Sequence, residues 1–343
     1  MTTLADYKYG GHDVEVRQTI AEVMENESPL LRVLTFDELT DNNVSRQRMY
    51  EDGDVQEHAV GDTWTVVNPT WEYRDAPLTI LGDNVTVDEF GDLASGQKGL
   101  MASQIEEKAR QLSRRFDKNA IYAQTTTYGA FTGSAMVGLL LHIARCETAT
   151  TTDLDGWIYT GNSDAANNKQ AVFAASGASA ALTIAMLEAL RDAVRPKATD
   201  YLMSLLMRRK LDDLCRATGT NLDVSEGKAG QIITRFGEQR VTIISSIKDN
   251  MTDSTSLVTA IASYDYTQAI AAGKDTSPIF AVAIGKTDFT GINGKGMIQV
   301  VDLAGGKDME SLDAKGKRVK AYLGLALRRK TSVAVLLNAN YSG

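Results

Sequence analysis

The sequence has 343 residues, of which 43% are hydrophobic and 23% charged, a composition typical of a folded globular protein rather than a disordered chain. The length suffices for one large domain or two ordinary domains. The formal net charge is -8 and the pI about 5.1, which argues against a dedicated nucleic-acid-binding protein, because such proteins carry a basic excess.

The first 45 residues predict an N-terminal arm. Residues 1–13 are polar and contain glycine, as expected for an extended segment. The spacing of apolar residues predicts a short helix over 14–27, which Ser28-Pro29 ends. The apolar segment 30–36 follows, and we expect it to dock the arm on the body of the protein.

Residues 46–90 change in character and predict a long β-arm. Short β-branched and aromatic segments, beginning with a strand over 60–67, alternate with turn signals such as Asn68-Pro69. Two of the three tryptophans, Trp64 and Trp71, lie in this stretch, where few positions could fill a core. We interpret it as an extended loop whose aromatic side chains need a surface from elsewhere. An ordinary hairpin folded onto its own domain is the alternative.

Residues 92–124 predict one long amphipathic helix, with Asp92 as its N-cap. Its apolar face comprises Leu93, Leu100, Ile105, Ala109, Leu112, Phe116, Ala120 and Ala123. The opposite face is charged, and Glu106 and Arg110 have the favourable i,i+4 spacing. Thirty-odd residues span about 45–50 Å, so we interpret the helix as a spine for other elements. Two helices with a break near 96–99 are the alternative.

The second half of the sequence alternates between helices and strands. The low-complexity stretch 155–179 predicts a loop, and it is followed by an amphipathic helix over 180–194. A buried strand is expected over 201–206, and then a helix over 207–218 that ends at Gly219. Runs of β-branched residues predict later strands over 239–246, 279–284, 297–303 and 319–337. The last of these is one long strand or two adjoining strands.

The sequence contains no clear catalytic, cofactor-binding or metal-binding pattern. Gly291–Gly296 lacks the spacing of a phosphate-binding loop and is interpreted as a connecting loop. Residues 153–156 resemble the start of a calcium loop without its remaining ligands. The three histidines are far apart, and neither GxSxG nor HExxH occurs. We therefore predict that the protein is not an enzyme and has no cofactor; an α/β enzyme with an unrecognised site is the less favoured alternative.

The cysteines and the N-terminal sequence indicate the cellular compartment of the protein. Cys146 and Cys215 form no CxxC motif, which is consistent with a reducing cytosol. The N-terminus lacks the basic and apolar segments of a signal peptide. The most apolar stretch, 135–144, is too short to cross a bilayer. We expect no association with a membrane.

The order of these elements resembles the major capsid proteins of tailed bacteriophages, whose Hong Kong 97-type shell fold is shared with encapsulins and herpesvirus floors. The resemblance covers nearly the whole chain and rests on patterns such as Trp64-Thr-Val-Val67, Trp71-Glu-Tyr73, Phe131-Thr-Gly133 and Phe236-Gly237. It implies an α+β fold with five parts. These are an N-terminal arm (1–45), an extended loop (46–90), a peripheral domain with the spine helix (91–195, returning near 296–335), an axial domain (196–295) and a C-terminal tail (336–343).

The resemblance also implies a structural function. Such a protein self-assembles into hexamers and pentamers of an icosahedral shell that encloses double-stranded DNA without sequence-specific binding, in the virion and, during assembly, in the host cytoplasm. The implied inter-subunit contacts of the extended loop are Trp64, Val66, Trp71 and Tyr73. They would lie across the neighbour's spine helix, which is built on Ile105, Leu112 and Phe116.

Many members of this family carry a long N-terminal scaffolding segment. Here the arm begins almost at Met1, so a separate scaffolding protein is expected, together with a portal. An encapsulin-type nanocompartment shell is the alternative function.

Overall fold

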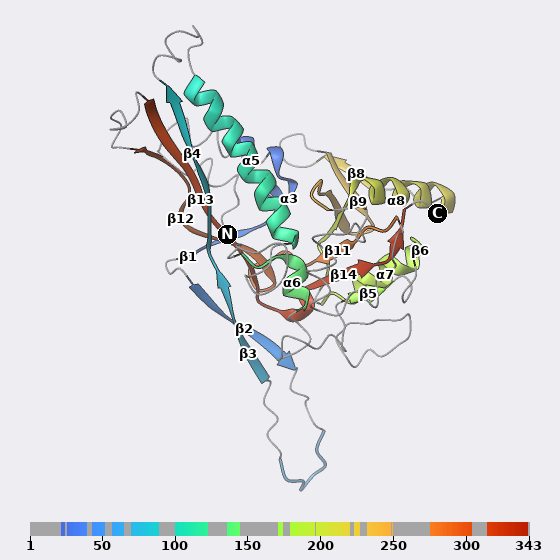
Figure 1. Cartoon of the computed structure of the whole chain (residues 1–343). Helices are drawn as coiled ribbons and strands as arrows, with labels where there is room; N and C mark the ends of the chain where they lie inside the picture. Colours follow the sequence, from blue (N-terminus) through green and yellow to red (C-terminus); the bar gives the residue numbers. More distant parts are fainter. Residues whose placement is uncertain are drawn as a thin grey trace.

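The computed structural model describes residues 22–24, 26–39, 43–51, 57–64, 70–88, 100–122, 136–144, 171–173, 179–195, 197–219, 223–226, 232–247, 249, 275–303 and 314–341. These residues form a four-stranded sheet, a seven-stranded sheet and two strand pairs. One of the pairs, β2–β3, projects from the rest of the chain (Figure 1).

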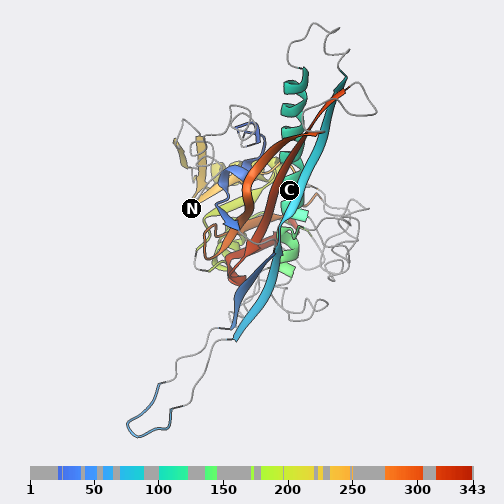
Figure 2. The ribbon, with the colours of Figure 1, turned by 90° about the vertical axis from the view of Figure 1, so that its left-hand side faces the viewer.

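The four-stranded sheet carries a long helix on one face. Its strand order is β1 (Phe36–Leu39), β12 (Phe289–Asp302), β13 (Ala314–Leu327) and β4 (Thr79–Asp88). β1 is parallel to β12, and the other two pairings are antiparallel. Along β4, Leu81, Val85 and Val87 are buried while their neighbours are exposed, because successive side chains of a strand point to opposite faces. The buried face packs against helix α5 (Leu100–Tyr122), which runs alongside the strands (Figure 2).

Helix α5 confirms the predicted apolar face of the spine. The residues of that face that are buried are Ile105, Ala109, Leu112, Phe116 and Ala120. The part of the helix that the structure describes has 23 residues, about 35 Å at 1.5 Å per residue. The expected N-cap Asp92 and the expected helix ends Leu93 and Ala123 lie outside the described residues.

The segment before β1 docks on the body, as predicted. Residues 22–24 and 26–27 are helical, and the rest of the helix expected over 14–27 lies outside the described residues. Ser28 ends that segment and also begins a second short helix, α3 (Pro29–Val33), because its hydroxyl accepts a hydrogen bond from the Leu31 N–H at 3.1 Å. Leu30, Leu31 and Leu34 are buried in the same core as α5.

The seven-stranded sheet forms the other half of the chain, and its strands are mostly short. Their order is β5 (Ala171–Phe173), β14 (Val333–Leu337), β11 (Ile279–Val282), β7 (Asp200–Met203), β10 (Gln239–Ile243), β9 (Ile232–Phe236) and β8 (Asp223–Glu226). The central strands β14, β11 and β7 are buried along their whole length, which explains the continuous apolar sequences of β14 and β11. Helices α7 (Ile184–Asp192) and α8 (Leu205–Thr218) share a core with this sheet, and α6 (Leu139–Ala144) packs beside α5.

Two predicted boundaries in this half are wrong, and in both cases a capping side chain explains the difference. The helix expected from residue 180 begins at Ile184, because the Thr183 hydroxyl accepts a hydrogen bond from the Met186 N–H. Residues 180–181 instead form β6, which pairs with β15 (Ala339–Asn340). The strand expected over 201–206 ends at Met203, since Ser204 caps α8 in the same way.

The helix end at Gly219 is confirmed. Gly219 has a φ of 69°, the left-handed conformation typical of the residue that ends a helix. The run 319–337 is two strands rather than one: β13 and β14 lie in different sheets and are joined by a 3-10 turn, η4 (Lys330–Ser332).

Two segments interpreted as loops contain strand. Gly291–Gly296 is part of β12, with an irregularity in pairing between Asn293 and Ile298. The glycines serve close packing there, since a Cβ on Gly291 would lie 2.5 Å from the Phe36 ring. Within 155–179, residues 171–173 form β5, parallel to β14, and the other described residue, Ser179, is in no strand.

Candidate assembly surface

The arm is a two-stranded ribbon that continues the four-stranded sheet. β2 (Asn43–Glu51) and β3 (Thr70–Pro77) pair antiparallel, and β3 passes through Leu78 directly into β4. The ribbon therefore extends the line of β4 beyond the body, and its tip, residues 57–64, lies at the far end (Figure 2).

The base of the arm is anchored by close packing on β12 and β13. Ala76 is buried in a small cluster with Ile292 and Ala326. Gly324 lies under the end of β3, where an added Cβ would be 2.7 Å from the carbonyl oxygen of Pro77. The ribbon thus leaves the sheet at a fixed position, and glycine is required at this approach.

The tip of the arm is closed by a tight turn. The Asp62 N–H donates to the Ala59 carbonyl oxygen at 3.1 Å, and the Ala59 N–H donates to Asp62 Oδ2 at 2.8 Å. Gly61 has a φ of 99°, as required at the third position of a type II turn. The strand predicted over 60–67 is therefore wrong at its start, because Val60 and Gly61 are turn residues.

The tip presents apolar side chains to solvent. Val60 is fully exposed, and Trp64 is 78% exposed. The Trp64 indole packs against the His58 ring, with 4.4 Å between the ring centroids. An indole this exposed is unusual in a folded chain.

The other residues predicted for this contact are only partly described. Trp71 and Tyr73 lie on β3 opposite Met49 and Gln47. Their side chains, and the whole of Val66, lie outside the described residues. Val60 and His58 were missed at the sequence level, although the Gly61-Asp62 pair is a recognisable turn signal.

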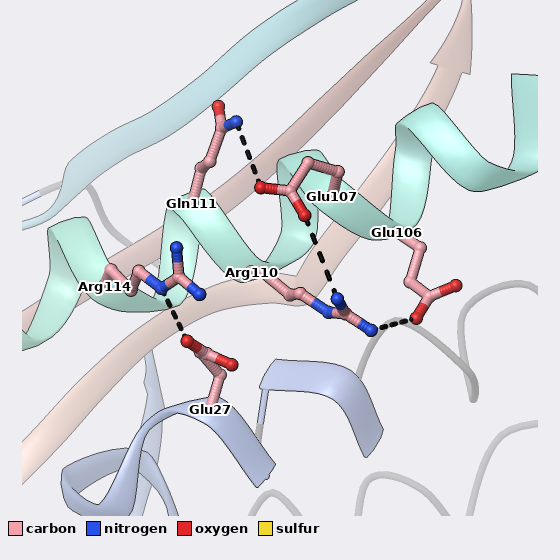
Figure 3. Close-up of polar contacts among 6 residues, drawn as sticks. All are labelled: Glu27, Glu106, Glu107, Arg110, Gln111 and Arg114. Atoms are coloured by element: carbon pink, nitrogen blue, oxygen red, sulfur yellow. Dashed lines mark hydrogen bonds and ion pairs between the residues drawn. The ribbon is translucent and has the colours of Figure 1, made fainter.

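The spine residues Ile105, Leu112 and Phe116 face the protein's own core, and the outer side of α5 is charged. The predicted pair Glu106–Arg110 is confirmed at 2.6 Å, and Arg110 also lies 3.9 Å from Glu107 (Figure 3). Arg114 pairs with Glu27 at 2.5 Å, which ties the helix to the N-terminal segment (Figure 3).

A buried carboxyl joins α5 to α3. Asp117 and Ser28 are both almost fully buried, and the Ser28 hydroxyl donates a hydrogen bond to Asp117 Oδ1. Burial raises the pKa of Asp117 to about 7; the hydrogen bond from Ser28 opposes this shift and the charge of Glu27 adds to it. The junction between the N-terminal segment and the spine therefore titrates near neutral pH.

Within the described residues, no group of three or more His, Cys, Asp or Glu side chains could hold a metal ion. The helices described are each too short or too polar to cross a membrane. Cys215 is a buried free thiol, and Cys146 lies outside the described residues.

No protein-family model matches the sequence, and no curated protein matches it. Solved structures do match over nearly the whole chain. A chain of the holo-SrpI encapsulin complex from Synechococcus elongatus PCC 7942 is 14% identical, with a TM-score of 0.61 over 100% of this chain and 97% of that chain. The capsid of the native GTA particle is 11% identical (TM-score 0.58; 91% and 90% covered), and a Mycobacterium phage Bobi structure is 12% identical (TM-score 0.53; 90% and 90% covered).

Proposed function

From the Hong Kong 97-type α+β fold, which these structures share with the chain, we propose that the protein is a self-assembling subunit of an icosahedral shell. The observation that carries the proposal is the arm. It presents Trp64 and Val60 to solvent at the end of a ribbon whose base packs on the body through Ala76. In a shell, symmetric contacts between copies cover such a surface.

The inter-subunit contact is made by the extended loop through Trp64, Val66, Trp71 and Tyr73. Subunits associate through these residues into hexamers and pentamers and act as structural components without a catalytic role. The division into arm, extended loop, peripheral domain, axial domain and tail follows the ranges expected from the sequence.

The shell encloses the double-stranded DNA of a tailed bacteriophage, without sequence-specific binding. A separate scaffolding protein and a portal are the further partners, and the subunit passes from the host cytoplasm into the virion. Support comes from the likeness to the capsid of a GTA particle and to the phage structure.

A nanocompartment shell is the second candidate. It is favoured by the match to the SrpI encapsulin chain, which covers 100% of this chain, compared with 91% for the GTA capsid.

The test is to image the purified chain by negative-stain electron microscopy over a range of concentrations. Closed particles of uniform diameter are expected, and small oligomers at every concentration, with and without co-expressed neighbouring genes, contradict the proposal. Nuclease-protected double-stranded DNA in particles from the native source supports the capsid. A folded cargo protein in its place supports the nanocompartment.

A further inference from the structure

The outer face of the four-stranded sheet, opposite α5, has the features of a docking surface. On β13, Val319, Ala321 and Leu323 are buried toward α5, so Arg318, Lys320 and Tyr322 lie on the other face. Residues directly opposite in a sheet share a face. The cross-strand partners on this outer face are therefore Ile80, Gly82 and Asn84 of β4 and Gln299 and Val301 of β12.

This outer face exposes apolar side chains. Ile80 is 64% exposed and Val301 is 44% exposed, on strands that flank β13 on either side. Tyr322 lies opposite Ile80 and is half-buried. An exposed patch that combines aliphatic and aromatic groups is typical of a protein contact.

The cations of the same face have neutral partners. Arg318 Nε donates to Asn84 Oδ1 at 2.8 Å, and Lys320 Nζ donates to the Tyr322 hydroxyl at 2.9 Å. Among the described residues, neither Arg318 nor Lys320 is paired with a carboxylate. The centre of the outer face is therefore positively charged.

On the outer side of α5, three cations are already paired with carboxylates of the same chain. Arg110 and Arg114 are paired with glutamates, and Lys108 is paired with Asp83 at 2.5 Å. The exposed large apolar side chains among the described residues include none from α5. The helix thus offers an incoming segment few apolar contacts.

The arm has the complementary character. Between residues 49 and 73 it contains six acidic residues and no Lys or Arg. At the tip, Glu57 is exposed and has no ion-pair partner among the described residues, and it lies beside the exposed Val60 and Trp64. An acidic, apolar tip matches a basic, apolar face.

We propose that the outer face of the sheet, centred on Arg318, Lys320 and Tyr322, is the surface that receives the arm tip of a second copy of this chain. The inference rests on the proposed shell function and names the docking surface within it. It replaces the expectation that the arm lies across the neighbour's spine helix. Ile80 and Val301 then cover the apolar tip, and the two cations meet its carboxylates.

Cysteine crosslinking in assembled particles tests this surface. Val60→Cys combined with Ile80→Cys is expected to give a ladder of covalent multimers on a non-reducing gel, because disulfides form only between Cβ atoms about 3.5–4.5 Å apart. Val60→Cys combined with Gln111→Cys, on the exposed side of α5, is expected to give none. The single-cysteine variants control for Cys146 and Cys215. A ladder from the Gln111 pair, or none from the Ile80 pair in intact particles, overturns the inference but leaves the shell function standing.

Charge reversal gives a second, independent readout. Lys320→Glu is expected to raise the protein concentration needed for assembly at least tenfold, and Glu57→Lys in the same chain is expected to restore most of the loss. Arg115→Glu, an exposed residue of α5, is the matched control and should change this concentration less than twofold. Unchanged assembly of Lys320→Glu, or a larger effect of Arg115→Glu, contradicts the inference. Failure of the unmodified chain to assemble, with and without co-expressed neighbouring genes, refutes the shell function itself.

Discussion

Replacement of Trp64 by Ala removes the largest exposed apolar group of the arm tip. An indole accounts for about 150–250 Å² of surface, and burying apolar surface contributes about 25 cal/mol per Å². Since Trp64 is 78% exposed in the single chain, covering it stabilises each inter-subunit contact by roughly 3–5 kcal/mol. A loss of about 3 kcal/mol corresponds to roughly a hundredfold change in an association constant. The variant should therefore need at least about a hundredfold more protein to assemble.

The assay is light scattering during assembly over a dilution series, with particles counted by electron microscopy. The folded subunit should change little, because the described ring contact of Trp64 is with His58, and such a contact is worth only about 0.5–1.5 kcal/mol. Trp64→Phe should keep much of the assembly. The double variant with Trp71→Ala should also fold but assemble poorly. Normal shells from either alanine variant at wild-type concentration would refute the reasoning.

Three further predictions concern the body of the subunit. Because the folded-state pKa of Asp117 is about 7, above the usual value of 3.8, the folded chain holds that proton between about pH 4 and 7, so this group's contribution to stability falls as pH rises through this window. The free energy of unfolding of Asp117→Asn, measured in urea, should therefore rise relative to that of the wild type by up to about 4 kcal/mol between pH 4 and pH 8. A difference between the two proteins that stays constant with pH would contradict this. Arg240→Ala leaves the buried carboxylate of Asp200 without its ion pair and should cost about 2–4 kcal/mol, whereas Lys197→Ala, which breaks an exposed pair, should cost less than about 1 kcal/mol. Equal effects in denaturant titrations would argue against that distinction. Gly324→Ala should cost about 1–3 kcal/mol by overpacking at the base of the arm and should impair assembly, and a neutral result in both assays would show that the base can relax.

Local periodicity accounts for what could be predicted of the fold. The buried face of α5 follows a helical repeat through Ile105, Leu112 and Phe116, and this repeat is visible in the sequence. The fully apolar runs of β11 and β14 were likewise recognisable as buried strands. The arm was predictable from a polar stretch that nevertheless contains Trp64 and Trp71.

The errors arise where distant segments decide the structure. Gly291 lies in a strand because it pairs with Phe36 and Leu325, both far away in the sequence. Leu205 is apolar enough to continue a strand, yet Ser204 caps a helix at that point. The outer sheet face could not be found from the sequence, since it depends on the register that places Ile80 and Val301 beside β13. Non-local register is not encoded in any local pattern.

A reconstruction of the assembled particle at side-chain resolution tests the central claim most directly. It should contain a closed shell in which the Trp64 indole of each subunit is covered by another copy of the chain, with the arm extended as in the single subunit. A particle in which Trp64 stays open to solvent, or packs back on its own subunit, would contradict the account.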